Sequence, residues 1–346
     1  MVSVISSLPP GDRIPQVHAG YLSEWRVRPG ESVGARCHAG AVTTVHLDVH
    51  GSFDLRQSAE FGFGQRHATT YDGSMTLAFC LDGYAEHAAV VVRPDGDGLA
   101  LEVVGGDPDV AVRQAARVLS VDVDARGYDA LGRSDDLVGR LQAALPGLRP
   151  PLFHSAYEAT TWSVLSARRP MGQAARLRDR LSREHGRVIE VAGEAAAAFP
   201  TPDQLLGVTD LPGLPEVALG RLHAIAEEAR GGGLDTEVLR SLPVVEAVER
   251  LRRLPGVGPF YAELVVVRAL GHTDVPPQHE GRVRDLAAAL TEQAGLDEPG
   301  FVALAERWRP WRTWVAVALR AAGPLLLDAE RAAAGAGPTV SGRGRP

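Results

Sequence analysis

The hydrophobic period of this chain changes near residue 120, and this change limits the fold more than any other feature. Between about 45 and 105, short runs rich in Val, Leu, Phe and Thr are separated by Gly-Ser, Asp-Gly and Pro-Asp-Gly-Asp-Gly. These separators are turn sequences because Gly and Asp adopt left-handed backbone angles. Residues 109–119 carry apolar side chains near helical spacing, so a helix should pack on the sheet. The runs predict a small antiparallel sheet with strands at 45–49, 75–81, 88–93 and 99–104.

Beyond residue 120, helical segments separated by Pro and Gly replace the strand pattern. Thr201 before Pro202 is typical of an N-cap followed by a first-turn proline, and Gly186 and Gly271 follow predicted helix ends. The fold class is therefore predicted as α+β, with a small antiparallel β-sheet domain followed by an all-α core. The predicted helices are at 156–168, 173–184, 202–206, 217–229, 244–253, 259–270 and 301–320.

The chain has 346 residues, which is more than a single hydrophobic core usually serves, so we expect several packed units. We predict an irregular extension over 1–44, an α+β sheet domain over 45–120, a helical core over 121–328 and a disordered tail over 329–346. No run reaches the roughly 18 apolar residues of a membrane helix, and no signal-peptide pattern opens the chain. We expect no membrane contact.

Composition excludes several classes of site. Hydrophobic residues make up 45% of the chain and charged residues 23%, as in folded globular proteins. Cys37 and Cys80 are too few for a four-thiolate iron-sulfur cluster or a disulfide framework, so we expect two buried free thiols. No His or Cys cluster indicates zinc. The net charge of −7 argues against a broadly basic surface, so a nucleic acid would have to be bound locally.

The most informative loop is Leu-Pro-Gly-Val-Gly-Pro at 254–259, between two predicted helices. Gly256 and Gly258 allow a sharp turn and the close approach of a partner, and Pro259 suits the first position of the next helix. The amides of Gly256, Val257 and Gly258 would then lie at the positive end of a helix dipole, where a phosphate binds without lysine. The alternative is a tight corner between two helices of any α protein.

Glu280 follows this turn after one helix and one loop, directly behind the Pro-containing segment 274–279. This arrangement resembles the helix-hairpin-helix GPD superfamily of DNA base-excision glycosylases, and most resembles its 3-methyladenine DNA glycosylase II branch. Segments 199–202, 251–262 and 305–312 agree with that branch. The β-rich N-terminal domain resembles the sheet domain that precedes its helical core. The resemblance spans about residues 150–325.

The resemblance implies a monofunctional DNA glycosylase of base-excision repair, which flips an alkylated purine of the 3-methyladenine type and hydrolyses its glycosidic bond. Glu280 stands where the family has its catalytic aspartate, an anion that stabilises positive charge developing on the sugar. The extra methylene can misplace the carboxylate by about 1 Å, which can cost on the order of a hundredfold in rate. Alternatively, Glu280 is a favourable charge at a helix start. Asp274, the nearest other carboxylate, is expected to cap or turn the loop.

Phe260 stands where strand-cleaving members of the superfamily carry a lysine that forms a Schiff base, so the resemblance implies no lyase activity. Phe260 also resembles the aromatic residue that lines the base pocket of the branch, whose electron-rich face suits a cationic purine. Its alternative role is a core side chain. Leu264, Gly281 and Arg320 occupy the positions of further pocket aromatics, which implies a remodelled base pocket.

Arg168 lies where the family has a residue wedged into the DNA stack. It would fill the gap left by the flipped base or, with Arg169, contact phosphate; an ordinary basic helix end is the alternative. Trp308, Trp311 and Trp314 recur every three residues with arginines between them. We interpret this stripe as core, with the arginines reaching solvent.

The resemblance implies no organic cofactor, and it places a monovalent cation on the backbone carbonyls of Arg252, Leu254 and Val257. His279 beside Glu280 is expected to be an ordinary exposed histidine. We expect a cytoplasmic, nucleoid-associated monomer whose partner is double-stranded DNA with a damaged base. Two other functions stay open: a catalytically impaired module of the same fold that binds damaged DNA, and a structural or protein-interaction role for the helical core.

Overall fold

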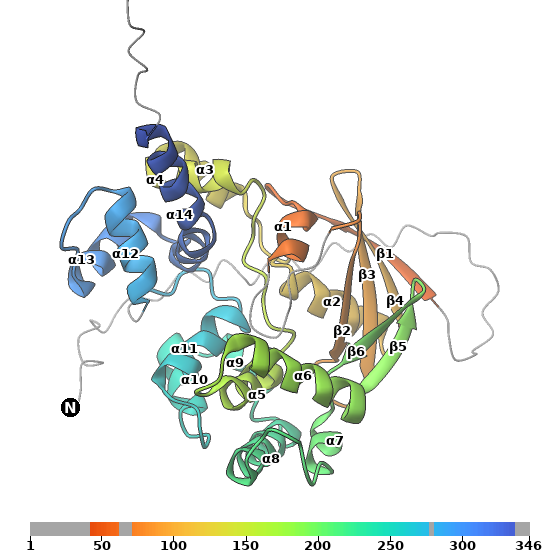
Figure 1. Cartoon of the computed structure of the whole chain (residues 1–346). Helices are drawn as coiled ribbons and strands as arrows, with labels where there is room; N and C mark the ends of the chain where they lie inside the picture. The colour runs from red at the N-terminus through yellow and green to blue at the C-terminus, as the bar shows by residue number, and fades with distance from the viewer. Residues whose placement is uncertain (1–41, 62–70, 277–279, 336–346) are drawn as a thin grey trace, which may run out of the picture.

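The computed structural model describes residues 42–61, 71–276 and 280–335. It contains an antiparallel sheet with two groups of helices beside it (Figure 1). Cys37 and His279 lie outside the described residues, as does most of the predicted N-terminal extension. Cys80 is a buried free cysteine, as expected.

The sheet is formed by four antiparallel strands in the order β1-β4-β3-β2. All four predicted strands are present, which confirms this part of the fold. Strand β1 begins three residues before the predicted start of the sheet domain at 45, because 42–44 pair with 102–104 of β4. The strands are β1 (Val42–Asp48), β2 (Met75–Cys80), β3 (His87–Asp95) and β4 (Gly98–Val104).

One face of the sheet is covered by helices, and α2 (Pro108–Val118) confirms the predicted packing helix. Asp107 caps α2 by accepting hydrogen bonds from the amides of Asp109 and Val110. The short helix α1 (Leu55–Glu60) adds Leu55 to the same core. Helices α1 and α2 and the strands therefore form one packed unit, whose largest buried side chains include Phe79.

A second hydrophobic core belongs to the helices that follow residue 155, with α5 at its centre. Every residue from Ala156 to Leu165 is buried. Thr201 forms a capping box with Gln204 at the start of α7, which confirms the predicted N-cap. The helices are α5 (Ala156–Ser166), α6 (Met171–His185), α7 (Pro202–Leu206), α8 (Glu216–Arg230), α9 (Thr236–Ser241), α10 (Val244–Leu251) and α11 (Pro259–Arg268).

A third core joins helices from both sides of this group. Trp308, Trp311 and Trp314 are buried in it, which confirms the predicted role of the tryptophan stripe. The predicted single helix over 301–320 is wrong, because Pro310 cannot donate an amide and interrupts it. The helices are α3 (Arg126–Ser134), α4 (Asp136–Ala144), α12 (Gly281–Leu290), α13 (Glu298–Ala305), a 3₁₀ turn (Glu306–Trp308) and α14 (Arg312–Gly335).

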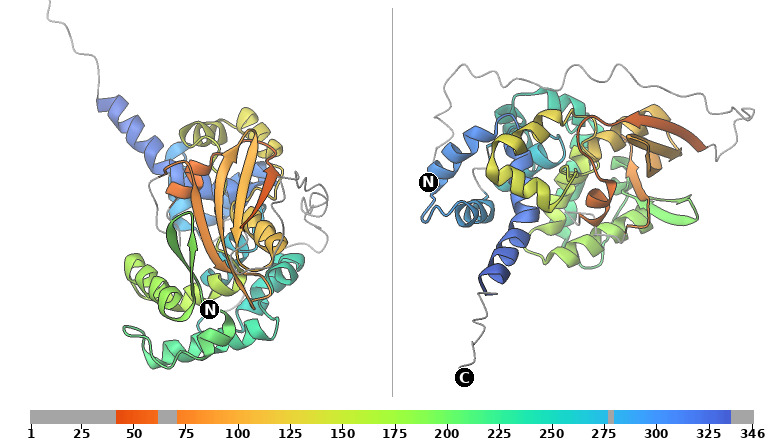
Figure 2. Two further views of the ribbon diagram at one scale, coloured as in Figure 1. Left: turned by 90° about the vertical axis from the view of Figure 1, so that its right-hand side faces the viewer. Right: turned by 90° about the horizontal axis from the view of Figure 1, so that it is seen from above.

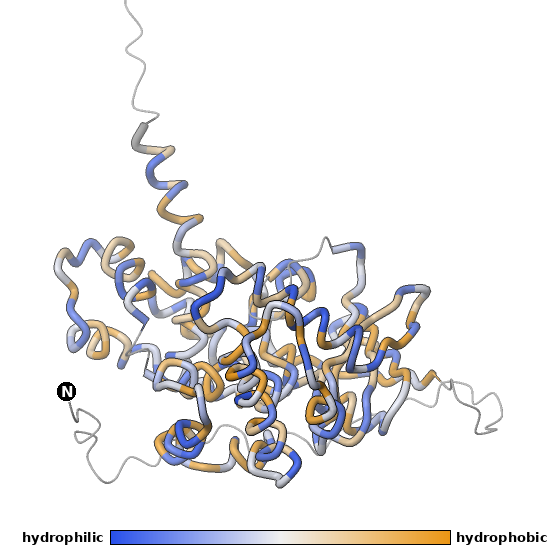
Figure 3. Tube along the Cα trace, turned by 60° about the horizontal axis from the view of Figure 1, so that its bottom comes forward, coloured by the Kyte–Doolittle hydropathy of each residue, from blue (hydrophilic) through white to orange (hydrophobic). Residues whose placement is uncertain are grey.

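Helix α14 includes the first seven residues of the predicted disordered tail. Its end projects away from the body in both views of Figure 2, and hydrophilic and hydrophobic residues alternate along it in Figure 3. An ion pair between Glu330 and Arg140 of α4 holds the projecting part. Alanine, which has the highest helix propensity, dominates the segment that follows.

The region predicted to be all-helical contains a hairpin of β5 (Arg187–Val191) and β6 (Glu194–Ala198). Its apolar residues Ile189 and Val191 pack on the sheet face formed by Ala89 and Val91. The turn residues Ala192 and Gly193 both have positive φ, as a two-residue hairpin turn requires. The prediction of a purely helical C-terminal part is corrected accordingly.

None of the helices in the described ranges combines the length and the hydropathy that crossing a membrane requires.

Candidate active site

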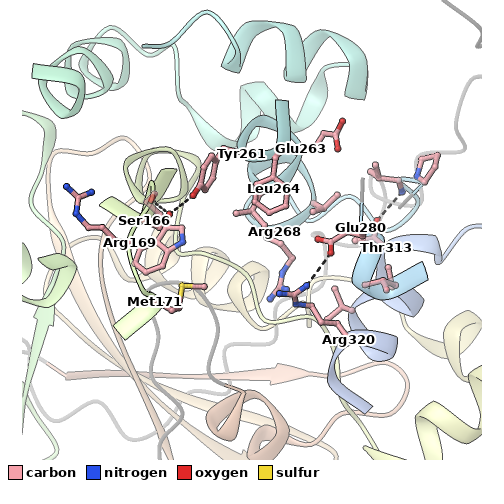
Figure 4. Close-up of a pocket in the computed structure, with 18 residues that line it drawn as sticks. Ser166, Arg169, Met171, Tyr261, Glu263, Leu264, Arg268, Glu280, Thr313 and Arg320 are labelled. Carbon is pink, nitrogen blue, oxygen red and sulfur yellow. Dashed lines mark hydrogen bonds and ion pairs between the residues drawn. The ribbon is translucent and has the colours of Figure 1, made fainter. Parts of the chain in front are cut away.

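A cavity of about 330 Å³ opens between the second and third cores (Figure 4). Binding sites commonly form at such boundaries between packed units. Its lining comes from the end of α5, the start of α6, the length of α11, the segment before α12, the first turn of α12, and α14. The lining residues are Trp162, Ser166, Arg169, Met171, Phe260, Tyr261, Glu263, Leu264, Val267, Arg268, Val275, Pro276, Glu280, Val283, Thr313, Ala316, Val317 and Arg320.

Glu280 is the N-cap residue of α12, yet its side chain accepts no capping hydrogen bond. The carboxylate instead lies at the cavity wall, where its Oε2 accepts a hydrogen bond of 3.2 Å from Nη1 of Arg320. Both side chains are partly exposed, at 34% and 43%. Figure 4 shows the pair reaching toward each other from α12 and α14. The carboxylate is therefore accessible from the cavity and does not cap the amides of its own helix.

Phe260 and Leu264 lie one turn apart on α11, and both line the cavity. Phe260 is 50% exposed and meets the Tyr261 ring edge-on at 5.3 Å. This exposure excludes the alternative of a core phenylalanine. The third matched position, Gly281, begins α12 and does not line the cavity.

The hairpin between α10 and α11 has the geometry that its glycines predict. Gly256 has a φ of +93°, and Pro259 is at the first turn of α11 behind the N-cap Gly258. The amides of Gly256 and Gly258 donate to no acceptor within the described part of the chain. The amide of Val257 donates to the carbonyl of Leu254 at 3.1 Å, and its side chain is buried. The Val257 amide thus stabilises the turn. The amides of Gly256 and Gly258, which donate to no acceptor in the described residues, are called the open amides of the hairpin.

The three carbonyls on which the family resemblance places a monovalent cation lie in this same hairpin. The carbonyl oxygen of Leu254 accepts the Val257 amide, while those of Arg252 and Val257 accept no hydrogen bond from the described residues. Neutral carbonyl oxygens suit a hard cation, so the donor set fits the expected monovalent ion. No group of three or more His, Cys, Asp or Glu side chains that could hold a metal occurs in the part of the chain described.

Arg168 and Arg169 behave differently in the turn after α5. Arg168 is exposed and has a φ of +56°, a left-handed conformation that costs energy in a residue with a side chain. Arg169 donates from Nη1 to the carbonyls of Val164 and Leu165, which closes the end of α5. Of the two, Arg168 is the one directed to solvent, and Arg169 caps its helix.

Asp274 neither caps nor turns the loop, contrary to the sequence prediction. It is buried, and its Oδ1 accepts a 2.6 Å hydrogen bond from Nε of Arg312. The same guanidinium donates to the Asp274 carbonyl at 3.0 Å. Arg312 is therefore buried as well, unlike the solvent-reaching arginine that was expected. This ion pair ties the loop before Glu280 to α14.

Several cavity residues were not foreseen from the sequence. The hydroxyl of Tyr261 lies 2.9 Å from Oγ of Ser166 and joins α11 to the end of α5. Met171, at the start of α6, is 56% exposed at the cavity. Arg268 is buried and donates to the carbonyl of Pro151. Only the position of Met171, directly after a proline-terminated turn, gave a signal in the sequence.

All 36 lysine and arginine residues of the chain are arginines, so the sequence contains no lysine. No ε-amino group is therefore present anywhere in the chain to form an imine with a sugar.

No protein-family model matches the chain. The chain is 29% identical over 182 residues to DNA-3-methyladenine glycosylase 2 of Escherichia coli, an alignment that covers 51% of this chain and 61% of that protein. It is 28% identical over 209 residues to a probable bifunctional transcriptional activator/DNA repair enzyme AlkA of Mycobacterium tuberculosis, covering 59% and 41%. The chain thus matches about two fifths to three fifths of the length of these curated relatives.

Solved structures show the same fold. A 3-methyladenine DNA glycosylase from Archaeoglobus fulgidus superposes with a TM-score of 0.68 at 20% identity, covering 81% of this chain and 99% of that one. An 8-oxoguanine glycosylase/lyase from Clostridium acetobutylicum gives a TM-score of 0.57 at 16% identity, covering 82% and 97%. The chain thus shares the fold of these DNA glycosylase structures, a small N-terminal sheet followed by a helical core, and it is similar in sequence to DNA-3-methyladenine glycosylase 2 and to AlkA.

Proposed function

We propose that this protein is a monofunctional DNA glycosylase that flips an alkylated purine of the 3-methyladenine type out of double-stranded DNA and hydrolyses its glycosidic bond. The observation that carries this proposal is the position of the Glu280 carboxylate. It lies at the wall of a cavity of about 330 Å³, within the size range of small-molecule sites. The identity of the relatives, which are named as DNA-3-methyladenine glycosylase and AlkA, supports the substrate class.

In this mechanism, the open amides of Gly256 and Gly258 hold a phosphate of the damaged strand. Arg168 enters the space left by the flipped nucleotide, and the base stacks on Phe260. As the bond between C1′ and the base nitrogen breaks, the base leaves with the electron pair and positive charge develops on the sugar. Glu280 stabilises that charge, water forms the new C1′–O bond, and the proton of the water is released. A cation held by the Arg252, Leu254 and Val257 carbonyls would add a second contact to phosphate.

The direct test is release of free base from methylated duplex DNA by the purified protein. We expect Glu280→Gln to reduce base release by on the order of a hundredfold or more, because the charge is lost while the shape is kept. Glu216, an exposed residue in the first turn of α8, gives the matched control, because Glu216→Gln removes a helix N-terminal charge outside the cavity. Equal losses in both variants would assign Glu280 to the helix and refute its catalytic role.

Product analysis tests the absence of lyase activity. Because the chain contains no lysine, we expect intact abasic strands that break only after alkali, and no covalent adduct after borohydride treatment. Strand cleavage without alkali, or a trapped adduct, would contradict the monofunctional assignment.

One observation favours a second candidate, a module of the same fold that binds damaged DNA without removing the base. The ion pair with Arg320 partly neutralises the carboxylate that the chemistry needs. Tight binding to damaged duplex with no base release, in the wild type as in Glu280→Gln, would identify this candidate.

A further inference from the structure

Two oppositely charged residues of the cavity wall, Glu280 and Arg320, are in contact with each other. Glu280 and Arg320 are 40 residues apart and come from different helices, yet their charged groups are 3.2 Å apart at the cavity wall. The pair is too exposed to add much to stability. Its placement in the cavity indicates a role toward whatever enters there.

The charged side chains that line the cavity do not make it anionic. Three arginines, Arg169, Arg268 and Arg320, line it together with two carboxylates, Glu263 and Glu280. The remaining lining is mostly apolar and comes chiefly from aliphatic side chains of α11, α12 and α14. An entering base therefore meets a guanidinium close to the carboxylate.

Aromatic stacking in the cavity is limited. Trp162 is almost fully buried, at 3% exposure, and the Tyr261 hydroxyl is engaged with Ser166. Phe260 is the most exposed aromatic of the lining. A cationic base gains its stacking advantage from electron-rich faces, and one phenyl face opposite aliphatic side chains provides little of it.

We propose that Arg320 is a specificity-determining residue of this pocket and that its pairing with Glu280 shifts the preference from cationic alkylated purines, such as 3-methyladenine, toward uncharged ones. This inference rests on the proposed glycosylase function and extends its substrate class from the 3-methyladenine type to uncharged alkylated purines. A guanidinium within a few ångströms of a cationic base repels it, and pairing with Glu280 weakens the attraction that an unpaired carboxylate would exert. An uncharged purine suffers no such repulsion, and its ring nitrogens or carbonyl oxygens accept hydrogen bonds from the remaining N–H groups of Arg320.

The test compares single-turnover release of two alkylated purines from otherwise identical duplexes: 7-methylguanine, which is cationic in DNA, and 1,N6-ethenoadenine, which is neutral. The variants are Arg320→Leu, which removes charge and donors, and Arg320→Gln, which removes charge and keeps a donor. We expect both to raise the ratio of cationic to neutral release by about tenfold at low salt. The increase should shrink at high ionic strength because salt screens exposed charges.

Arg331, exposed near the end of the same helix and paired with Asp328, supplies the control. Arg331→Gln should leave the ratio unchanged. If Arg320→Leu lowers release of both bases by the same factor, Arg320 is only structural and the proposal is overturned. A falling ratio would overturn it as well.

A binding measurement decides the proposal even if the wild type releases no base, an outcome that would refute the proposed function alone. The probes are duplexes carrying a cationic pyrrolidine or a neutral tetrahydrofuran in place of the abasic sugar. In Arg320→Leu the Glu280 carboxylate is unpaired, so preference for the pyrrolidine duplex should rise about tenfold. An unchanged preference would overturn the role of Arg320 independently of catalysis.

Discussion

Gly256 and Gly258 lie two residues apart in the hairpin, but only one of them requires glycine for its backbone. Gly256 has a φ of +93°, and a Cβ there would lie 3.0 Å from Cδ of Arg221. At Gly258, φ is −82° and a Cβ would meet nothing within 4 Å. We expect Gly256→Ala to lower the free energy of unfolding by about 1–3 kcal/mol and Gly258→Ala to leave it nearly unchanged. Urea denaturation of both variants measures this difference.

A DNA-binding measurement distinguishes a phosphate-binding hairpin from a hairpin that only connects two helices. If a phosphate lies on the open amides, the methyl group of Gly258→Ala blocks its approach, so affinity for duplex DNA should fall about tenfold without loss of stability. Fluorescence anisotropy with a labelled duplex measures the affinity. Unchanged binding by a fully stable Gly258→Ala protein would indicate that the hairpin is only a helix-helix corner.

At the residue scale, the sequence predicted backbone features better than side-chain pairs. The positive φ of Gly256 follows from its local motif, and the exposure of Phe260 at the cavity agrees with the first of the two roles that the resemblance left open. The pairing of Glu280 with Arg320 could not be predicted, because it depends on how α12 and α14 pack. Arg312 illustrates the same limit: its neighbours suggested a solvent-exposed arginine, whereas its buried partner Asp274 is 38 residues away.

At the scale of elements, the loop between α11 and α12 is held by the Asp274–Arg312 pair. Removing the Asp274 charge leaves the buried Arg312 with the Glu306 carboxylate as its remaining charged partner. We therefore expect Asp274→Asn to destabilise the protein by about 3 kcal/mol, the lower end for a broken buried pair. The loop leads to Glu280, so base release per folded molecule should also fall, by less than in Glu280→Gln. Thermal denaturation and single-turnover kinetics below the unfolding transition measure the two effects.

An ion pair on the surface serves as a control, because it shows whether burial causes the loss of stability expected in Asp274→Asn. Arg93 and Glu102 pair across neighbouring strands at 2.7 Å, with both side chains more than a third exposed. Glu102→Gln should cost no more than about 1 kcal/mol. Equal losses in Glu102→Gln and Asp274→Asn would contradict the assignment of Asp274 as a buried anchor.

Local sequence signals identified the four strands of the main sheet and the central helices, whereas α1, α3, α4, α9 and α12 had no predicted counterpart. Helix periodicity and caps located α5–α8, α10 and α11 to within three residues of their ends. The β5–β6 hairpin was missed because its strands have five residues each and lie between helices. The helix predicted over 301–320 ignored Pro310, a residue that ends helices by losing its amide donor. Short strands and proline breaks carry less periodic signal than long helices do.

At the scale of the whole molecule, the sequence predicted a sheet domain and one helical core, but the helices form two separate hydrophobic cores. Helices α3 and α4 precede the central group in the chain, yet they pack with α12–α14. Periodicity shows that a helix has an apolar face but not which partner covers it. The cavity lies between these two cores, so its existence could not be predicted from the helix pattern.

The buried Glu158 makes stability depend on acidity. Burial alone would raise its pKa, but the charges of Arg178 and His154, 2.6 and 2.9 Å away, lower the pKa to about 2 from an ordinary 4.5. A depressed pKa means that the unfolded chain takes up the proton first as pH falls. The contribution of Glu158, roughly 3 kcal/mol, is therefore complete above pH 4.5 and is lost as pH falls toward 2.

Urea unfolding between pH 7 and pH 3 tests this dependence. Stability should decrease below about pH 4.5, and Glu158→Gln should both destabilise the protein at pH 7 and flatten this decrease. The exposed Glu216→Gln variant should follow the wild type. If stability still decreases below pH 4.5 in Glu158→Gln as steeply as in the wild type, other carboxylates cause the acid sensitivity.

A chain with a net charge of −7 can bind DNA only through a local cluster of cations, and the hairpin has one. Arg221, Arg252 and Arg253 are exposed beside it, as is Arg168 on the turn after α5. None of the four forms an ion pair with a described residue. Each phosphate neutralised contributes about −0.9 to the slope of log K against log salt concentration. Because Arg168 is assigned to the gap left by the flipped base, the three arginines at the hairpin predict a slope of roughly −3.

Titration of a labelled duplex at several salt concentrations measures this slope. Changing Arg252 and Arg253 together to Gln should make it less steep by about 2, because two counterion-releasing contacts are lost. The same change at Arg113 and Arg133, which are exposed on α2 and α3, should leave it unaltered. A slope of about −8 or steeper would require a much wider basic interface. That result would contradict local binding, because the acidic remainder of the surface could not supply so many contacts.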